Sequence, residues 1–281
     1  MSYLSYAVQP NVKPIPGIQN IIAVGSGKGG VGKSTVAVNL ALGFAKLGAR
    51  VGMLDADIYG PSQPHLLGLQ GQKPVTEGKL FEPLYAHGIA AMSIGFLVDP
   101  STPTVWRGPM VSGALQQLLG QTRWGGLDVL IVDLPPGTGD IQLTLAQKIP
   151  VTGAVVVTTP QDLALLDARK AIGMFEKLGI TVLGVLENMT MHQCEQCGHT
   201  SAIFGEAGGL RLAEQYQVPF LGSVPLVRQI REQADLGVPT VAAAPESPLG
   251  QTYIGLAQGV LQALRQKPRD KHVPVAVSVS S

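Results

Sequence analysis

The chain has 281 residues, 45% of them hydrophobic and 14% charged, and its 20 Lys and Arg residues nearly balance its 19 Asp and Glu residues. This length suits one large α/β domain or two small ones, and the lack of a long Pro/Gly/Ser linker favours one. The balanced charge gives no long-range field that would point to DNA or to an anionic membrane, and it leaves a local basic patch open. No apolar run reaches the roughly 20 residues that cross a bilayer, and the N-terminus lacks a signal pattern, so we expect a cytoplasmic protein.

Three parts are expected along the chain. Residues 1–17 contain three prolines and no hydrophobic period, and we expect a flexible lead-in there. A single domain then covers residues 18–267, with an insertion near 189–204 that carries both cysteines. Residues 268–281 follow the last periodic helix and are expected to form a flexible tail.

A glycine-rich loop between an apolar strand and a helix dominates residues 23–39, AVGSGKGGVGKSTVAVN. Residues 27–34 fit G-x-x-x-x-G-K-[ST], a loop whose backbone N–H groups surround phosphate oxygens. Glycine is expected there because a Cβ would block the approach of the main chain to phosphate, and some turns need positive φ. Lys33 would reach the outer phosphates, and the Ser34 hydroxyl suits Mg²⁺. The expected nucleotide contacts in this loop are Gly27, Lys28, Gly29, Gly30, Val31, Gly32, Lys33, Ser34 and Thr35.

Acidic residues follow two of the predicted strands. Strand 50–54 runs into DADIYGPS, which places Asp55 and Asp57 at the carboxyl end of a strand, where ligands bind in open α/β sheets. The alternative is that both are solvated turn residues that cap a helix. Strand 127–133, LDVLIVD, is apolar enough for burial on both faces and ends at Asp133, which is placed to hold magnesium through water. In the following DLPPGTGD, the N–H of Gly137 could bind a γ-phosphate.

The remaining elements follow from apolar periodicity. The helix after the glycine-rich loop should present one apolar face, made of Ala37, Leu40, Ala41 and Phe44. Residues 79–85 and 89–97 could pair as a hairpin that covers a sheet edge. Ser247 and Pro248 form a good start for the last helix. Further strands are expected at 154–159, 180–188 and 220–225, with a helix at 162–177.

Both cysteines, Cys194 and Cys197, lie in one C-x-x-C pattern. Their sulfurs are close enough to share a metal or to form a strained disulfide. Two thiolates are half of a four-coordinate site, so one chain cannot complete a cysteine-only site, whereas a two-fold dimer supplies four. Iron–sulfur binding, zinc binding with His192 or His199, and a redox dithiol remain the candidate roles.

In combination, these motifs resemble those of the Mrp/ApbC-type iron–sulfur carriers. That group belongs to the P-loop NTPases with a deviant Walker A motif, which include MinD, ParA and the nitrogenase iron protein. The resemblance covers residues 21–234 and includes the two-lysine loop KGGVGKS, DADIYGPS, WRGPM at 106–110, DLPPGTGD and CxxC, in that order. It implies an α/β fold, with a mostly parallel twisted sheet and helices on both faces.

The resemblance also implies roles for individual residues. ATP would gate a homodimer in which Lys28 reaches the partner's phosphates, and Lys28, Lys33 and Asp57 would be the catalytic set. Asp57 would orient the attacking water, and Asp55 would lie near the magnesium shell. Ser34 and Asp133 would place Mg²⁺. Asn188 and Pro225 would frame the adenine, although Asn188 could instead only terminate a strand.

The function implied is that of an ATPase that carries a 4Fe–4S cluster. Cys194 and Cys197 of two chains would hold the cluster at the homodimer interface, for transfer to apo iron–sulfur proteins, with no stable nucleic-acid or membrane partner. The alternative is a spatial-organising ATPase of the MinD or ParA kind that binds membrane or DNA, with CxxC as a zinc clamp. The last helix lacks the basic amphipathic face that MinD-type membrane binding needs, and neither organising role explains CxxC.

Overall fold

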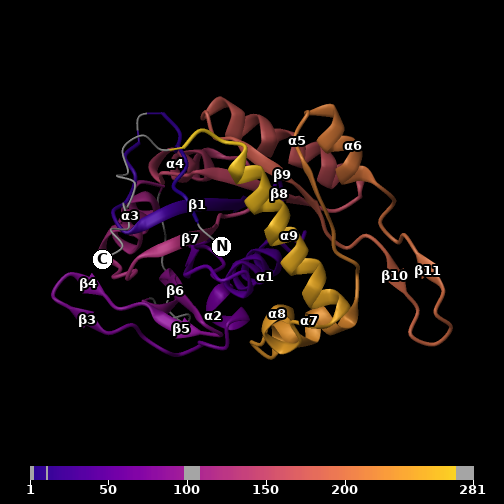
Figure 1. Ribbon diagram of the computed structural model, residues 1–281, viewed down its shortest axis with the longest axis horizontal. Coiled ribbons are helices and arrows are strands. Elements are labelled where there is room, and N and C mark those ends of the chain that lie inside the picture. The colour runs from indigo at the N-terminus through magenta and orange to yellow at the C-terminus, as the bar shows by residue number, and fades with distance from the viewer. Residues whose placement is uncertain (1–2, 11, 98–107, 270–281) are drawn as a thin grey trace, which may run out of the picture.

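One eight-stranded sheet organises the chain. The computed structural model describes residues 3–10, 12–97 and 108–269 (Figure 1). All neighbouring strands of the sheet are parallel except the last pair, β5 and β6. In order across the sheet, the strands are β12 (Phe220–Ser223), β9 (Val182–Glu187), β8 (Gly153–Thr158), β1 (Ile18–Gly25), β7 (Leu127–Asp133), β2 (Val51–Asp55), β6 (Ile89–Ser93) and β5 (Leu84–Ala86).

Helices cover both faces of this sheet, so the predicted fold class is confirmed. One face contacts α1 (Lys33–Lys46) and α9 (Pro248–Arg265), and the other contacts α5 (Asp162–Lys177) and α6 (Gly208–Gln215). The other helices of the part of the chain that the structure describes are α2 (Gln63–Leu66), the 3₁₀ turn η1 (Ile94–Phe96), α3 (Gly108–Gln121), α4 (Asp140–Lys148), α7 (Arg228–Asp235) and α8 (Thr240–Ala243).

Within the described residues, two short antiparallel ladders lie outside the sheet. The first pairs β3 (Thr76–Glu77) with β4 (Leu80–Phe81), and the second pairs β10 (His192–Gln193) with β11 (Thr200–Ser201). Figure 1 shows the β10–β11 hairpin projecting beyond the rest of the molecule. The cysteine pattern lies at the turn of this hairpin, so the insertion predicted from the sequence is an extension away from the core.

The predicted hairpin of residues 79–85 and 89–97 is shorter than expected. Only β5 pairs with β6, whereas Leu80–Phe81 turns to β3 instead. Pro83 lies between these two short strands and has no N–H to donate to a ladder, which separates them. The other edge of β6 pairs with β2, so this hairpin closes one side of the sheet as expected. Of WRGPM, Trp106 and Arg107 lie outside the described residues.

Helix α1 is buried around its whole circumference, and not on one face as predicted. Every residue from Val36 to Phe44 is buried. The outer side of α1 is covered by α9, and a Cβ added at Gly43 would lie 3.0 Å from the Ala257 Cβ. A helix that is apolar on all sides belongs in the interior, and here the second covering layer is provided by α9.

The lead-in contacts the domain at the amino edge of the sheet. Tyr6 and Gln9 are buried, and the Gln9 side-chain amide donates to the Ala146 carbonyl at 2.9 Å. The Ala7 N–H donates to the carbonyl of Pro268 at 3.0 Å, so the lead-in and the start of the tail are neighbours. The domain limits and the flexibility of both end segments remain predictions.

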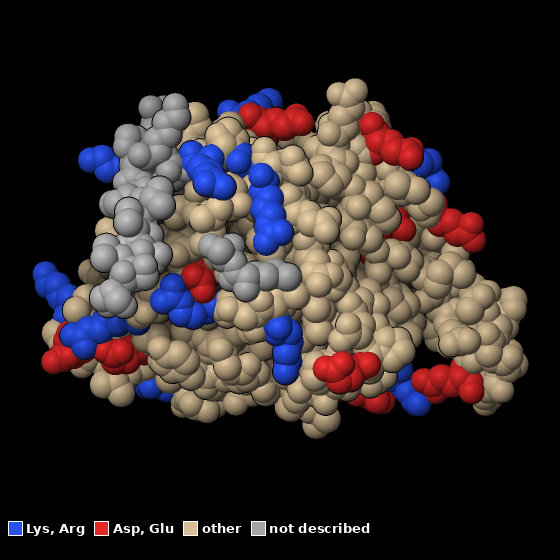
Figure 2. All heavy atoms as spheres, viewed as in Figure 1, with Lys and Arg blue, Asp and Glu red and all other residues tan. Residues whose placement is uncertain are grey.

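The surface agrees with the balanced composition on the face that Figure 2 shows. Much of this face is uncharged, and basic and acidic side chains both occur on it. Among the described residues, no helix combines the length and the apolar character that crossing a membrane requires.

Asn39 links α1 to α8 inside the core, which allows a test of this packing. It is fully buried, its amide donates to the Thr35 carbonyl, and its oxygen accepts the Val241 N–H, both at 2.9 Å. We expect Asn39→Leu to lower the free energy of unfolding by about 1–3 kcal/mol, because the Val241 N–H loses its acceptor in the core. Urea denaturation measures the loss, with the exposed amide change Gln258→Leu as the control, expected within about 0.5 kcal/mol. Equal stability of Asn39→Leu and wild type would contradict this role.

Candidate functional site

The candidate site lies where β1, β2 and β7 end. The parallel register sets Asp55 of β2 and Val24 of β1 opposite Asp133 of β7. The glycine-rich loop continues from β1 into α1 at this same edge. Residues far apart in the sequence are therefore brought to one point by the register of the sheet.

The glycines of the loop are needed for different reasons. Gly30 and Gly32 have φ values of 82° and 80°, so the predicted need for positive φ is confirmed at both. Gly27 differs, because a Cβ there would lie 2.1 Å from the backbone carbonyl of Asp167 in α5. The absence of a side chain at Gly27 thus serves packing against α5, which the sequence analysis did not anticipate.

Lys33, Ser34 and Asp133 meet in the interior of the site. Lys33 is 6% exposed and Asp133 is fully buried, and the Lys33 ammonium donates to Asp133 Oδ1. The same ammonium lies 3.2 Å from Ser34 Oγ. A carboxylate and a hydroxyl side by side form the hard oxygen set that Mg²⁺ prefers, so these residues fit the ion expected from the sequence. Lys28 lies half-buried in the same loop.

Asp55 is buried and is not a solvated turn residue. Its Oδ1 accepts the Asp57 N–H at 3.1 Å, and its Oδ2 accepts the Gln63 N–H at 3.0 Å and the Ser93 hydroxyl at 3.2 Å. Burial raises the pKa of Asp55 to about 7, and the charge of Asp133 acts in the same direction. Asp57 is half-buried, and burial also raises its pKa. Asp55 therefore organises the loop after β2, while Asp57 in the same loop stays partly exposed.

Gly137 is already hydrogen-bonded within the protein. Its N–H donates to the Ser26 carbonyl at 2.9 Å, which joins the loop after β7 to the glycine-rich loop. A contact between this N–H and a γ-phosphate requires that bond to be exchanged. The predicted role of Gly137 thus depends on a rearrangement of the loop after β7.

A cleft of about 300 Å³ opens beside the start of α1. Asn188, Met189 and Pro225 line it together with Thr35 and residues of α7. The Asn188 amide donates to the Val31 carbonyl at 2.9 Å, so this side chain holds the glycine-rich loop rather than only ending a strand. Asn188 and Pro225, predicted to frame the adenine, do lie on one cleft next to the loop.

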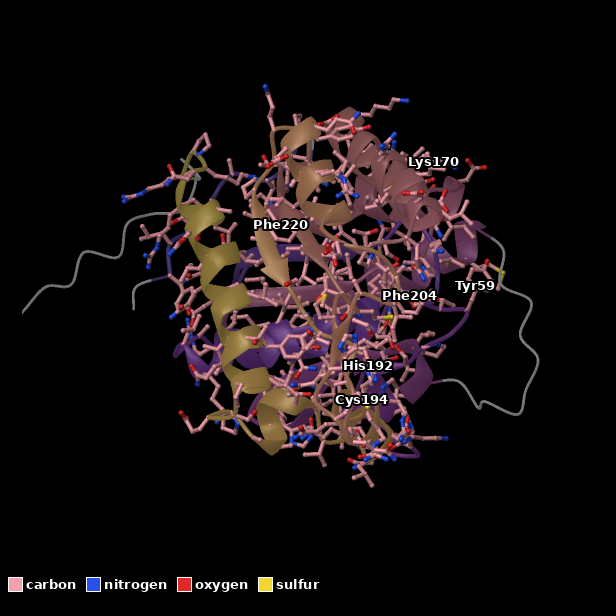
Figure 3. All side chains as sticks on the ribbon, turned by 90° about the vertical axis from the view of Figure 1, so that its right-hand side faces the viewer. Tyr59, Lys170, His192, Cys194, Phe204 and Phe220 are labelled. Carbon is pink, nitrogen blue, oxygen red and sulfur yellow. The ribbon has the colours of Figure 1, made fainter. Side chains whose placement is uncertain are left out.

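The cysteine pair occupies the turn of the β10–β11 hairpin. Cys194 is half-buried and Cys197 is exposed, and both are free thiols. The backbone N–H groups of Cys197 and Gln196 hold the pKa of Cys194 below its usual range, which favours the thiolate that binds metals. Figure 3 views the molecule from the hairpin side and shows Cys194 and His192 toward the viewer.

No histidine completes the pair within the described part of the chain. His192 Nδ1 lies 3.2 Å from the Leu226 carbonyl, in the segment after β12. Residues 3–10, 12–97 and 108–269 contain no group of three His, Cys, Asp or Glu side chains arranged for a metal ion. Within these residues, the hairpin turn thus presents two cysteine sulfurs without a third donor arranged beside them.

The cleft and the cysteine turn are joined by short contacts. The Leu226 N–H donates to the Met191 carbonyl at 2.9 Å, and the Thr190 N–H donates to the Val224 carbonyl at 3.1 Å. From α7, the Arg228 guanidinium reaches Glu195, between the two cysteines, at 2.7 Å. Because other residues of α7 line the cleft, this helix contacts both places.

Gln63 and Arg228 are the site residues that sequence reasoning missed. Gln63 follows DADIYGPS directly, and its side-chain amide donates to Asp133 Oδ2 at 2.9 Å. A glutamine before a proline is typical of an ordinary helix start. Only its position directly after the acidic motif could have indicated that Gln63 belongs to the site. For Arg228 the chain carries no local signal, since its contact with Glu195 depends on how α7 sits against the hairpin.

Comparisons with known proteins identify relatives of this chain. A family model described as ParA, NUBPL iron-transfer P-loop NTPase, matches residues 17–261. An iron–sulfur cluster carrier protein of Pseudomonas fragi is 59% identical over 254 residues, which cover 90% of this chain and 88% of that protein. The iron–sulfur cluster transfer protein NUBPL of Mus musculus is 49% identical over 261 residues, which cover 92% and 82%.

Solved structures show the same architecture. A nucleotide-binding protein of Archaeoglobus fulgidus, in complex with ADP, matches with a TM-score of 0.68 and 42% identity, over 79% of this chain and 87% of that one. The cell division ATPase MinD of Pyrococcus furiosus matches with a TM-score of 0.65 and 22% identity, over 86% and 98%. The likeness to MinD concerns the fold alone.

The raised pKa of Asp55 predicts a pH dependence of stability. The pKa of Asp55 rises from its ordinary value of 3.8 to about 7 in the folded protein. Between these two pH values Asp55 is ionised in the unfolded chain but still protonated in the folded protein. The free energy of unfolding therefore falls as pH rises through this window. Without nucleotide and with a chelator, we expect Asp55→Asn to remove on the order of 2–4 kcal/mol of that decline. Urea unfolding of both proteins at pH 5 and pH 8 measures it.

The matched control is Asp162→Asn, at an exposed aspartate that begins α5. Its stability should follow the wild-type pH dependence. If Asp55→Asn also declined as steeply as wild type between pH 5 and pH 8, Asp55 would be ionised in the folded protein throughout this range.

Proposed function

The chain belongs to the family of NUBPL iron-transfer P-loop NTPases, and from this premise we propose that it is a cytoplasmic ATPase that carries a 4Fe–4S cluster. Two copies of the chain hold the cluster between them and pass it to apo iron–sulfur proteins. Neither a stable nucleic-acid partner nor a membrane partner takes part. The relatives named as cluster carriers or transfer proteins support the cargo, and the glycine-rich loop supports the nucleotide.

One observation carries the proposal, namely the half-site of two thiols on a projecting hairpin. Cys194 and Cys197 are accessible, and the pKa of Cys194 is held low, as thiolate ligation requires. A cubic cluster takes four cysteine thiolates, and a two-fold axis beside the hairpin brings four together. The site is incomplete without the second copy, which makes the homodimer part of the proposal.

In the candidate nucleotide site, different residues have different roles. Lys33 moves from Asp133 to the outer phosphates, where its charge stabilises the negative charge that develops there. Mg²⁺, when bound, neutralises phosphate charge, with Ser34 and Asp133 as its protein partners. Asp57 orients the attacking water, and Lys28 reaches the phosphates of the partner subunit. The cleft beside α1 takes the adenine between Asn188 and Pro225.

Nucleotide state and cluster binding are coupled through the segment that the two places share. Asn188 holds the glycine-rich loop, and three residues later Met191 is bonded to Leu226 on the cleft wall. The ion pair of Arg228 with Glu195 adds a second link, although exposed pairs of this kind contribute only about 0–1 kcal/mol. ATP thereby shifts the population between packings that hold the cluster tightly and loosely.

The experiment that tests the proposal is metal analysis after anaerobic reconstitution. We expect about four iron and about four acid-labile sulfide per dimer in wild type, and loss of both in Cys194→Ala, because a cluster that has lost ligands is not retained. A visible spectrum and the oligomeric state are recorded on the same samples. His192→Ala serves as the control and should keep the cluster.

The other outcomes of this experiment separate the alternatives. Zinc alone, lost in both Cys194→Ala and His192→Ala, would make the hairpin a zinc clamp and would contradict the carrier. The organising ATPase of the MinD or ParA kind would then be tested by co-sedimentation with liposomes and with DNA in the presence of ATP. A dimer without iron or zinc would also contradict the proposal.

Replacing each of the two loop lysines, Lys28 and Lys33, by alanine should have a different effect. Lys28→Ala should bind ADP within about twofold of wild type but lose at least about tenfold in ATP-dependent dimerisation, because only the partner's phosphates lose a charge. Lys33→Ala should lose nucleotide binding and stability, since it leaves Asp133 buried without its cation. Light scattering with a non-hydrolysable ATP analogue measures dimerisation. The exposed Lys170→Ala is the control, and a Lys28→Ala protein that dimerised normally would remove Lys28 from the partner's site.

A further inference from the structure

Gln63 is a buried side chain that contacts three parts of the candidate site. It is 1% exposed at the first position of α2. Its side-chain amide donates to Asp133 Oδ2 at 2.9 Å and lies 3.1 Å from the Ser34 carbonyl. Its backbone N–H donates to Asp55 Oδ2 at 3.0 Å. One residue thus connects the ends of β2 and β7 with the first turn of α1.

The orientation of the Gln63 amide follows from its neighbours. The two atoms near Nε2 are both acceptors, a carboxylate oxygen and a carbonyl oxygen, so the nitrogen and not the oxygen must lie between them. Oε1 is left buried, with no hydrogen-bond donor among the described residues.

Asp133 has two oxygens with different partners. Oδ1 faces the Lys33 ammonium, which the proposed function sends to the phosphates, and Oδ2 faces Gln63. When Lys33 leaves, Gln63 becomes the donor that still holds the carboxylate in the orientation seen here. In metal sites generally, groups that hydrogen-bond to a ligating side chain orient that ligand, and losing one weakens metal binding by about 10–100-fold.

We propose that Gln63 is a positioning residue that holds the Asp133 carboxylate for Mg²⁺ and ties it to the loop after β2, an inference that rests on the proposed nucleotide function. Its Oε1 stays buried beside this cluster as an unused acceptor. Because its backbone holds Asp55 and its side chain holds Asp133, Gln63 transmits a change in one loop to the other.

The experiment measures magnesium separately from nucleotide. ADP binding is followed with a fluorescent ADP analogue in a chelator, and then as magnesium is titrated. For Gln63→Met, which keeps the length of the side chain but lacks the donor, we expect the half-saturating magnesium concentration to rise by about 10–100-fold. Affinity for ADP without magnesium should stay within about twofold, since no atom of Gln63 is placed on the nucleotide. A merely structural residue would change both affinities together.

Two further variants keep the test decisive. Gln63→Asn retains an amide but shortens its reach by one methylene, so it should show the same magnesium defect even if Gln63→Met folds poorly. Gln9→Met removes another buried amide, at the amino edge of the sheet, and should leave magnesium dependence unchanged. Thermal unfolding shows that each protein is folded.

The outcomes distinguish this inference from the function on which it rests. If wild type binds ADP with magnesium and both Gln63 variants do so at the wild-type magnesium concentration, the positioning role is wrong and the proposed function stands. If wild type itself binds no nucleotide, both are wrong. A loss in Gln9→Met equal to that in Gln63→Met would assign the effect to stability.

Discussion

A single cation serves two buried carboxylates at the centre of this molecule. Lys33 is bonded to Asp133, and Asp55 lies opposite Asp133 in the register of β2 and β7. Burial of Asp55 is the main reason why its pKa is raised to about 7, and the nearby charge of Asp133 adds to that rise. The two carboxylates and the ammonium are thereby grouped at one edge of the sheet, beside the glycine-rich loop.

The sheet supports this charge cluster by its register and its burial. Parallel strands covered on both faces place their carboxyl ends at one edge, where the loops are free to carry polar groups. The helix that begins at Lys33 cannot shift easily, because it is enclosed between the sheet and α9 and is tied to α8 through Asn39. The enclosed α1 therefore holds the backbone of Lys33 and Ser34 in place beside the carboxyl ends of β2 and β7.

The end of β9 joins the nucleotide region to the hairpin. Glu187 is buried and accepts the Gly209 N–H at the start of α6, Asn188 holds the glycine-rich loop, and Met189 turns the chain outward with a φ of 58°. These three consecutive residues thus contact α6, the glycine-rich loop and the cleft, in that order.

By itself, the sequence determined the fold class, the loop between β1 and α1, the acids that end β2 and β7, and the cysteine pair. These are local patterns, in which residues close together in the sequence carry the chemistry. Strand 127–133 and helix 162–177 also match their predicted limits. Only the tertiary structure decided that Gln63 meets Asp133, 70 positions away, that Asn39 meets Val241, and that Gly27 packs on α5. The full burial of α1 was also invisible, because the covering layer comes from the last helix of the chain. Such contacts depend on where distant backbone segments come to lie, and no spacing within one segment encodes that.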